Sequence, residues 1–271
     1  MSNFWQRLIT GTLFTAGIVA SIWYGPLSFQ LLFFIAAIIS LNEFYTLISN
    51  SQNQPNKTLG LLLGALTYLF ISYTSFTTNH PKLLVLLVPI SVIVFIAELY
   101  RKKENPFGNI GYTFLGILYI MVPFALLSTI SAHEGEYDRG ILLGYFFLVW
   151  SSDTFAYVFG NLFGKHRLFE RISPKKSWEG VIGGGICTLG IAYLLSIYQL
   201  QIELFSWLII AAIIVVTGIL GDLCESLLKR SLGVKDSGNI LPGHGGLLDR
   251  FDALFLSAPI VWAYLAYFVN K

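Results

Sequence analysis

This sequence of 271 residues is poor in charge, because Asp, Glu, Lys and Arg make up only 12% of it. Soluble domains usually carry about 25%. Cysteine is scarce too: Cys187 and Cys224 lie in or beside apolar runs and have no metal-ligand spacing. Their arrangement argues against a disulfide framework and against a zinc site. A repeat architecture is also disfavoured, since no period of about 20–50 residues recurs along the chain.

Apolar residues, in contrast, are abundant and come in long runs. They make up 55% of the chain, and its mean hydropathy is +0.69. A helix needs about 20 apolar residues to span a bilayer. We therefore predict an all-α, polytopic integral membrane protein with about nine transmembrane helices and two functional cytoplasmic loops. The predicted spans are 8–24, 27–47, 59–76, 83–99, 108–130, 140–159, 180–198, 204–228 and 251–269.

The first apolar run could pass for a signal peptide, because it follows Arg7. No small-residue cleavage motif comes after it, so we expect a retained helix. The sequence continues directly through Gly25 and Pro26 into the second run. Such a tight connection is compatible with two membrane spans or with a re-entrant hairpin, and both arrangements stay open.

The distribution of basic residues indicates an orientation. If nine spans alternate, all but three of the 17 Lys and Arg residues fall on the side of the N-terminus; the exceptions are Lys82, Arg139 and Lys271. Basic loops stay in the cytoplasm. We therefore expect the polar loops 160–179 and 222–250 to be cytoplasmic. Residues 1–131 are predicted to form N-terminal transmembrane helices, and residues 132–271 a C-terminal transmembrane catalytic region of one continuous membrane domain.

Asp153 lies inside the sixth predicted span, where an unpaired carboxylate costs several kcal/mol. Tyr157, Gly160 and Gly164 share its helical face, and the glycines permit close approach by a helix or a ligand. The alternative is that Asp153 merely pairs with a neighbouring helix. We predict that Asp153 and Tyr157 bind substrate. Two other acids, at the ends of the second and fourth spans, are expected just to reach the membrane interface: Glu43 and Glu98.

The loop after the sixth span contains the run SPKKSWEG at residues 173–180. Lys175 and Lys176 supply point charges that suit phosphate oxygens. Pro174 is expected at a turn or a helix start, and Ser177 can cap the next helix. The glycines that follow would let backbone amides approach an anion. The alternative is a positively charged cytoplasmic loop without a ligand.

The segment 221–252 combines many ionisable residues with a glycine-rich loop. Asp222 and Glu225 lie one helical turn apart at the end of the eighth span, and Asp249 and Asp252 open the ninth. Carboxylate pairs of this kind suit a hard divalent cation. If the loop between them folds back, the acids of both helices converge. Surface solvation and helix capping are the alternatives. The joint occurrence of the acidic pairs and the glycine-rich loop in so short a segment nevertheless favours a site.

A family signature is recognisable in these residues. The run 226–252, SLLKRSLGVKDSGNILPGHGGLLDRFD, resembles the signature of the phosphatidate cytidylyltransferase (CDP-diacylglycerol synthase) family. The chain is also similar to that family at Asp153, Ala156, Tyr157 and Gly160, and at SPKKSWEG. The specific likeness covers about residues 150–252. The N-terminal half resembles the family only as a set of apolar spans.

The resemblance implies a reaction in which CTP and phosphatidic acid give CDP-diacylglycerol and pyrophosphate for phospholipid biosynthesis. It implies dependence on Mg²⁺ and an all-helical membrane fold, with a homodimer as one assembly. The expected partners are CTP, phosphatidic acid and membrane lipid, with no nucleic acid. We expect a multi-pass protein of the cell inner (cytoplasmic) membrane, with its active site facing the cytoplasm.

On this reading the phosphate of the lipid attacks the α-phosphorus of CTP, so catalysis comes from positioning and cations. The predicted ligands of one or two Mg²⁺ ions are Asp222 and Asp249, then Glu225 and Asp252; a monovalent cation is a further candidate. Catalytic roles are also predicted for Lys229, Arg250 and His244. The remaining predicted substrate-binding residues are Ser173, Lys175, Lys176, Ser177, Ser226, Arg230, Lys235, Asp236, Gly245 and Gly246.

Three rival functions follow from the same features. The chain could use another lipid phosphate, such as an isoprenoid ether lipid, because acceptor choice depends on an apolar groove that the sequence does not identify. A transporter would spread its carboxylates across the membrane depth, whereas these gather at one face. A CDP-alcohol phosphotransferase would need a D-G-x-x-A-R type of run, which the sequence lacks.

Overall fold

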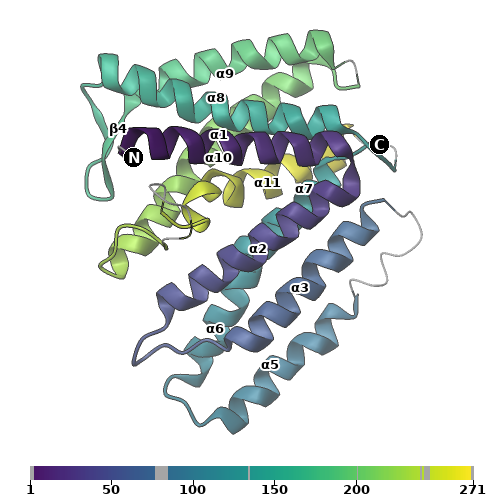
Figure 1. Ribbon diagram of the computed structural model, residues 1–271, viewed down its shortest axis with the longest axis vertical. Coiled ribbons are helices and arrows are strands. Elements are labelled where there is room, and N and C mark those ends of the chain that lie inside the picture. Colours follow the sequence, from purple (N-terminus) through teal and green to yellow (C-terminus); the bar gives the residue numbers. More distant parts are fainter. Residues whose placement is uncertain are drawn as a thin grey trace. The chain divides into compact units, whose positions relative to one another are not determined.

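Helices dominate the computed structural model, which describes residues 3–76, 85–133, 135–199, 201–238, 240 and 245–269 (Figure 1). The strands in this part of the chain form two short antiparallel hairpins. Strand β1 (Ala132–His133) pairs with β2 (Glu136–Tyr137), and β3 (Arg167–Phe169) pairs with β4 (Ser173–Ser177). The all-α prediction is confirmed.

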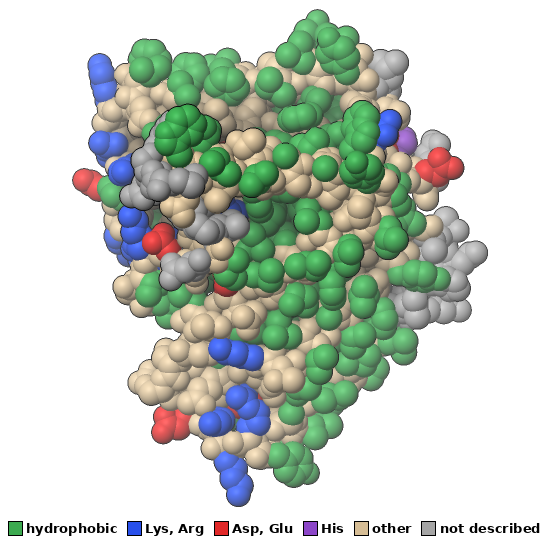
Figure 2. Space-filling model, viewed as in Figure 1, with side chains coloured by type: hydrophobic (Ala, Val, Ile, Leu, Met, Phe, Trp, Pro, Cys, Tyr) green, Lys and Arg blue, Asp and Glu red, His purple; other side chains and the backbone are tan. Residues whose placement is uncertain are grey.

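Seven helical segments of the described chain are long and apolar enough to cross a membrane. They are Pro26–Ile48, Lys57–Thr74, Pro106–Ile130, Arg139–Phe163, Trp178–Tyr198, Leu204–Ser231 and Asp252–Val269. Two further predicted spans correspond to the shorter apolar helix Leu8–Tyr24 within α1 (Asn3–Tyr24) and to α5 (Leu87–Arg101), which has 15 residues. Apolar side chains also cover much of the visible surface (Figure 2). The chain is therefore a multi-pass membrane protein.

The chain divides into two compact units, and the first comprises Met1–Tyr137 together with Asp236–Phe251. It contains α1, α2 (Pro26–Ile48), α3 (Lys57–Thr74), α5, α6 (Pro106–Gly116), the π-helical turn η1 (Ile117–Met121), α7 (Val122–Ile130), the β1–β2 hairpin and the 3₁₀ turn η2 (Leu248–Arg250). Phe251 lies in its aromatic core, with ring centroids 5.9 Å from Phe33 and 4.8 Å from Phe124. Part of the signature run, Asp236–Phe251, belongs to this unit and is called the signature loop below. Burial of these rings ties the signature loop to the N-terminal helices.

The connection between α1 and α2 is made by Gly25, whose φ of 132° is readily accessible only to glycine. Pro26 then occupies the first turn of α2, where its missing N–H leaves no helical bond unmade. The Ser28 hydroxyl closes the turn by donating to the Ser21 carbonyl at 2.6 Å. A tight turn between these helices was predicted, and it is confirmed.

The second unit comprises Asp138–Lys235 and Asp252–Lys271. It contains α8 (Arg139–Phe163), the β3–β4 hairpin, α9 (Trp178–Tyr198), α10 (Leu204–Ser231), α11 (Asp252–Tyr264) and the π-helical turn η3 (Leu265–Val269). The α10–α11 crossing is close, because a Cβ at Gly221 would collide with the backbone carbonyl of Asp252. This approach places the acidic ends of both helices beside each other.

One local expectation for residues 173–184 needs correction. Pro174 lies in β4 and not at a turn or helix start; an edge strand tolerates proline because one side of it needs no ladder bonds. The glycines of α9 pack against α8: Gly183 faces Phe159, and Gly184 faces the backbone of Ala156. Helix packing accounts for these glycines, and the approach of an anion to the backbone amides stays a prediction.

Candidate active site

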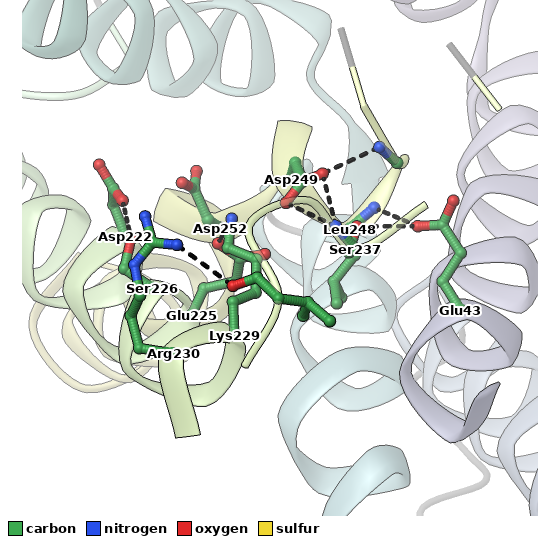
Figure 3. A network of polar contacts seen from close by, with 12 residues as sticks. Glu43, Asp222, Glu225, Ser226, Lys229, Arg230, Ser237, Leu248, Asp249 and Asp252 are labelled. Atoms are coloured by element: carbon green, nitrogen blue, oxygen red, sulfur yellow. Dashed lines mark hydrogen bonds and ion pairs between the residues drawn. The ribbon is translucent and has the colours of Figure 1, made fainter. Parts of the chain in front are cut away.

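The second unit gathers three carboxylates and one lysine. Asp222 near the end of α10 and Asp252 at the start of α11 lie on neighbouring helices (Figure 3). The carboxyl group of Asp252 is close enough to Asp222, Asp153 and Lys176 to interact electrostatically with each. The Lys176 Nζ forms an ion pair of 2.5 Å with the Asp222 Oδ2. Four predicted site residues from α8, β4, α10 and α11 thus form one cluster.

Lys176 is held in place by the junction between β4 and α9. Ser177 is the N-cap of α9, and its hydroxyl accepts the Gly180 N–H at 3.2 Å, as predicted. In the first turn of α9, Glu179 accepts the backbone N–H groups of Lys165 and His166 at 3.1 and 3.2 Å. These bonds fasten the β3–β4 hairpin to the helix and limit the positions that Lys176 can reach.

Glu225 and Lys229 form an ion pair within α10, one turn below Asp222. The Lys229 Nζ lies 2.5 Å from the Glu225 Oε2, with side-chain exposures of 12% and 0%. When one partner of a pair buried to this degree is removed, the other charge is left unpaired in the interior and the folded protein is strongly destabilised. In the structure, Glu225 and Lys229 are therefore partners of each other. The metal role predicted for Glu225 and the catalytic role predicted for Lys229 stay predictions.

Two further residues of α10 shape the cluster. The Ser226 hydroxyl donates to the Asp222 Oδ1 at 3.2 Å, one turn along the helix (Figure 3). The Arg230 Nη1 donates to the Val234 carbonyl at 3.2 Å and closes the helix end. Ser226 thus orients Asp222, and Arg230 is exposed beside the helix terminus.

Asp249 closes the signature loop of the first unit. Its Oδ2 accepts the backbone N–H groups of Ser237 at 3.0 Å and Gly246 at 2.9 Å (Figure 3). Gly245, beside it, has a φ of +83°, which favours glycine. Asp249 and Asp222 belong to different compact units, so their predicted convergence stays a prediction.

Glu43 and Glu98 are buried, with exposures of 6% and 5%, and the expectation that they reach the membrane interface stays a prediction. Glu43 accepts the backbone N–H groups of Leu247 and Leu248. Glu98 pairs with Arg101 at 2.6 Å and accepts from Asn109. A lone acid in an apolar helix was the available signal for Glu43, but nothing local to it indicated the distant loop.

The other predicted residues have varied settings. Ser173 is half-buried and Gly246 is buried, while His244 lies outside the described residues. The remaining candidates are exposed, namely Tyr157, Lys175, Lys235, Asp236 and Arg250. Exposed basic side chains can still meet an incoming anion.

The donor set fits a magnesium ion that is completed by substrate. Among the described residues, no three His, Cys, Asp or Glu side chains are arranged to hold a metal by themselves. Mg²⁺ commonly binds one or two carboxylates and takes its other ligands from water and phosphates. Asp222 and Asp252 are partly exposed and supply such oxygens.

Comparison with known proteins identifies relatives along nearly the whole chain. A sequence model described as the cytidylyltransferase family matches residues 5–268. A phosphatidate cytidylyltransferase of Bacillus subtilis is 32% identical over 97% of this chain and 98% of its own. A phosphatidate cytidylyltransferase from Staphylococcus epidermidis is 33% identical over 88% of this chain and 89% of its own. Another, from Staphylococcus saprophyticus, is 40% identical over 65% of this chain and 66% of its own.

Proposed function

The chain belongs to the cytidylyltransferase family, and from that membership we propose which residues carry its reaction. It transfers the cytidylyl group of CTP to phosphatidate and releases pyrophosphate, giving CDP-diacylglycerol. The observation that carries the proposed site is the cluster of Asp153, Lys176, Asp222 and Asp252. It contains the acids and the lysine that such a transfer needs, contributed by α8, β4, α10 and α11.

The chemistry requires anions to be brought together. The phosphate of phosphatidate is already a nucleophile, so deprotonation contributes little to its attack on the α-phosphorus of CTP. Most of the barrier comes from repulsion between the two anions and from charge that develops on pyrophosphate as it leaves. Positioned cations and hydrogen-bond donors lower such a barrier most effectively. The cluster therefore acts mainly by orientation and charge.

We propose that Asp222 and Asp252 hold Mg²⁺, with Asp249 as a further ligand from the signature loop and Glu225 as a secondary candidate. Bound there, Mg²⁺ would neutralise charge on the phosphates of CTP. Ser226 would keep Asp222 oriented through its hydrogen bond. A second ion, including a monovalent one, is part of the same proposal.

Lys176 is proposed to bind a substrate phosphate while it stays near Asp222. An ammonium group has three donors, so its ion pair with Asp222 leaves donors for phosphate oxygens. Lys175, Ser173 and Arg250 are also proposed to contact substrate phosphates. The pair with Asp222 explains how a flexible lysine can be ready before substrate arrives.

We propose that this site faces the cytoplasm from the inner membrane, as the distribution of basic loops predicts. CTP would then enter from the cytosol, and the phosphate of phosphatidate would lie at the headgroup level. A homodimer is proposed from the family likeness alone. The mass of the protein in detergent or nanodiscs tests that assembly.

The direct test is pyrophosphate release by purified protein supplied with CTP, phosphatidate and Mg²⁺. We expect release with phosphatidate and much less with an isoprenoid ether lipid phosphate. Asp222→Asn should fold in membranes but release none. Wild-type activity in that variant would refute the proposed site, and preference for the ether lipid would refute the acceptor.

A further inference from the structure

A carboxylate from α2 holds the signature loop. Glu43 accepts the Leu247 N–H on Oε1 at 3.0 Å and the Leu248 N–H on Oε2 at 2.8 Å (Figure 3). The Ser237 hydroxyl is 3.4 Å from Oε2. These donors all come from the loop, about 200 residues further along the chain, as the separations of 194 to 205 show.

The loop also leaves room for this carboxylate. A Cβ at Gly238 would lie 2.7 Å from the Glu43 Oε1, and a Cβ at Gly246 would lie 2.7 Å from Oε2. Real Cβ atoms essentially never come so close to another heavy atom. Glycine at both positions therefore has a packing reason, which is to let Glu43 reach the backbone N–H groups of Leu247 and Leu248.

Burying a carboxylate is unfavourable unless its oxygens are hydrogen-bonded. Within the described part of the chain, no Lys or Arg lies in ion-pair distance of Glu43. Its stabilisation thus comes from the loop's own donors, and charge-assisted bonds of this kind are stronger than neutral ones. Such an arrangement makes the position of Leu247 and Leu248 depend on Glu43.

Those two residues immediately precede Asp249. Asp249 in turn accepts the N–H groups of Ser237 and Gly246, so the loop is fixed by two carboxylates from different elements. We propose that Glu43 is a positioning residue that keeps Asp249 in its working orientation. This inference rests on the proposed role of Asp249 as a metal ligand.

Glu43→Gln tests the inference, because an amide keeps the size of the side chain but replaces one of the two acceptor oxygens. We expect faster hydrogen exchange in peptides covering residues 245–251. We also expect the Mg²⁺ concentration for half-maximal activity to rise about tenfold, the effect of weakening one charged hydrogen bond. If Glu43→Gln fails to fold, Glu43→Asp retains both oxygens on a shorter stem and should give a similar shift.

Glu98→Gln is the matched control, since Glu98 is an equally buried acid of the same unit with partners remote in sequence from the loop. It should lower the melting temperature without altering loop exchange or the Mg²⁺ requirement. Asp249→Asn separates the two proposals. If it is fully active, the assigned metal site is wrong; if it is inactive while Glu43→Gln behaves as wild type, the inference about Glu43 is overturned.

Discussion

At the scale of single residues, the charges of the site are arranged as pairs. Lys176 pairs with Asp222 and Lys229 pairs with Glu225, each at 2.5 Å. The first pair is partly exposed, with side-chain exposures of 23% and 34%, while the second is nearly enclosed. The exposed pair can exchange partners with a substrate at low cost, whereas the enclosed pair stabilises α10. We infer that Lys176 contributes to substrate binding, and that the Glu225–Lys229 pair stabilises α10 whatever further role its members have.

Lys176→Ala should therefore raise the KM for CTP or phosphatidate about tenfold while changing the melting temperature little. Removing one exposed charge costs little stability, but loss of a lysine–phosphate contact weakens binding by about 1–2 kcal/mol. Steady-state kinetics with each substrate varied in turn would measure the effect. Lys103→Ala, an exposed lysine of the other unit, is the control; an unchanged KM in Lys176→Ala would rule out the proposed contact.

At the scale of elements, the α10–α11 crossing sets the geometry of the cluster. Gly221 lies against the backbone of Asp252, and Gly218 faces the side chain of Ala253. Small residues at a crossing let two helix backbones approach closely. Because Asp222 follows Gly221 directly, this packing decides where two proposed ligands stand.

Gly221→Ala should separate the helices and cost both stability and activity. The new Cβ would meet backbone, which cannot rotate away, so we expect about 1–3 kcal/mol of destabilisation. Gly190→Ala in α9 is a suitable control, since a Cβ there would have no atom within 4 Å. Thermal unfolding and pyrophosphate release would be measured for both. Equal behaviour of the two variants would contradict the role given to Gly221.

Elements were also the level at which the sequence was most informative. Long apolar runs predicted the helices, and Gly25 with Pro26 predicted the turn between α1 and α2, because bilayer thickness and backbone sterics act locally. The segment 221–252 pointed to Asp222 and Asp252. The Lys176–Asp222 pair and the Glu43 anchor could not be predicted, since both join segments distant in sequence. The strand at Pro174 was missed because proline disfavours a strand and its partner β3 is only 3 residues long.

At the scale of the whole molecule, the account requires both polar loops on one side of the membrane. Single cysteines introduced into a Cys187→Ser, Cys224→Ser background would test this. Arg167→Cys in β3 should react with an impermeant maleimide only from the cytoplasmic side, and Arg139→Cys at the start of α8 only from the opposite side. Labelling of both from one side would refute the predicted topology.

Asp222 and Asp252 are proposed to hold a divalent ion together with the phosphates of CTP. Titration of purified protein with Mn²⁺ in the presence of CTP, followed by electron paramagnetic resonance, tests it without relying on turnover. The account predicts saturable Mn²⁺ binding to the wild type that is weakened at least about tenfold in folded Asp222→Asn and Asp252→Asn. Equal Mn²⁺ affinity in all three proteins would contradict it.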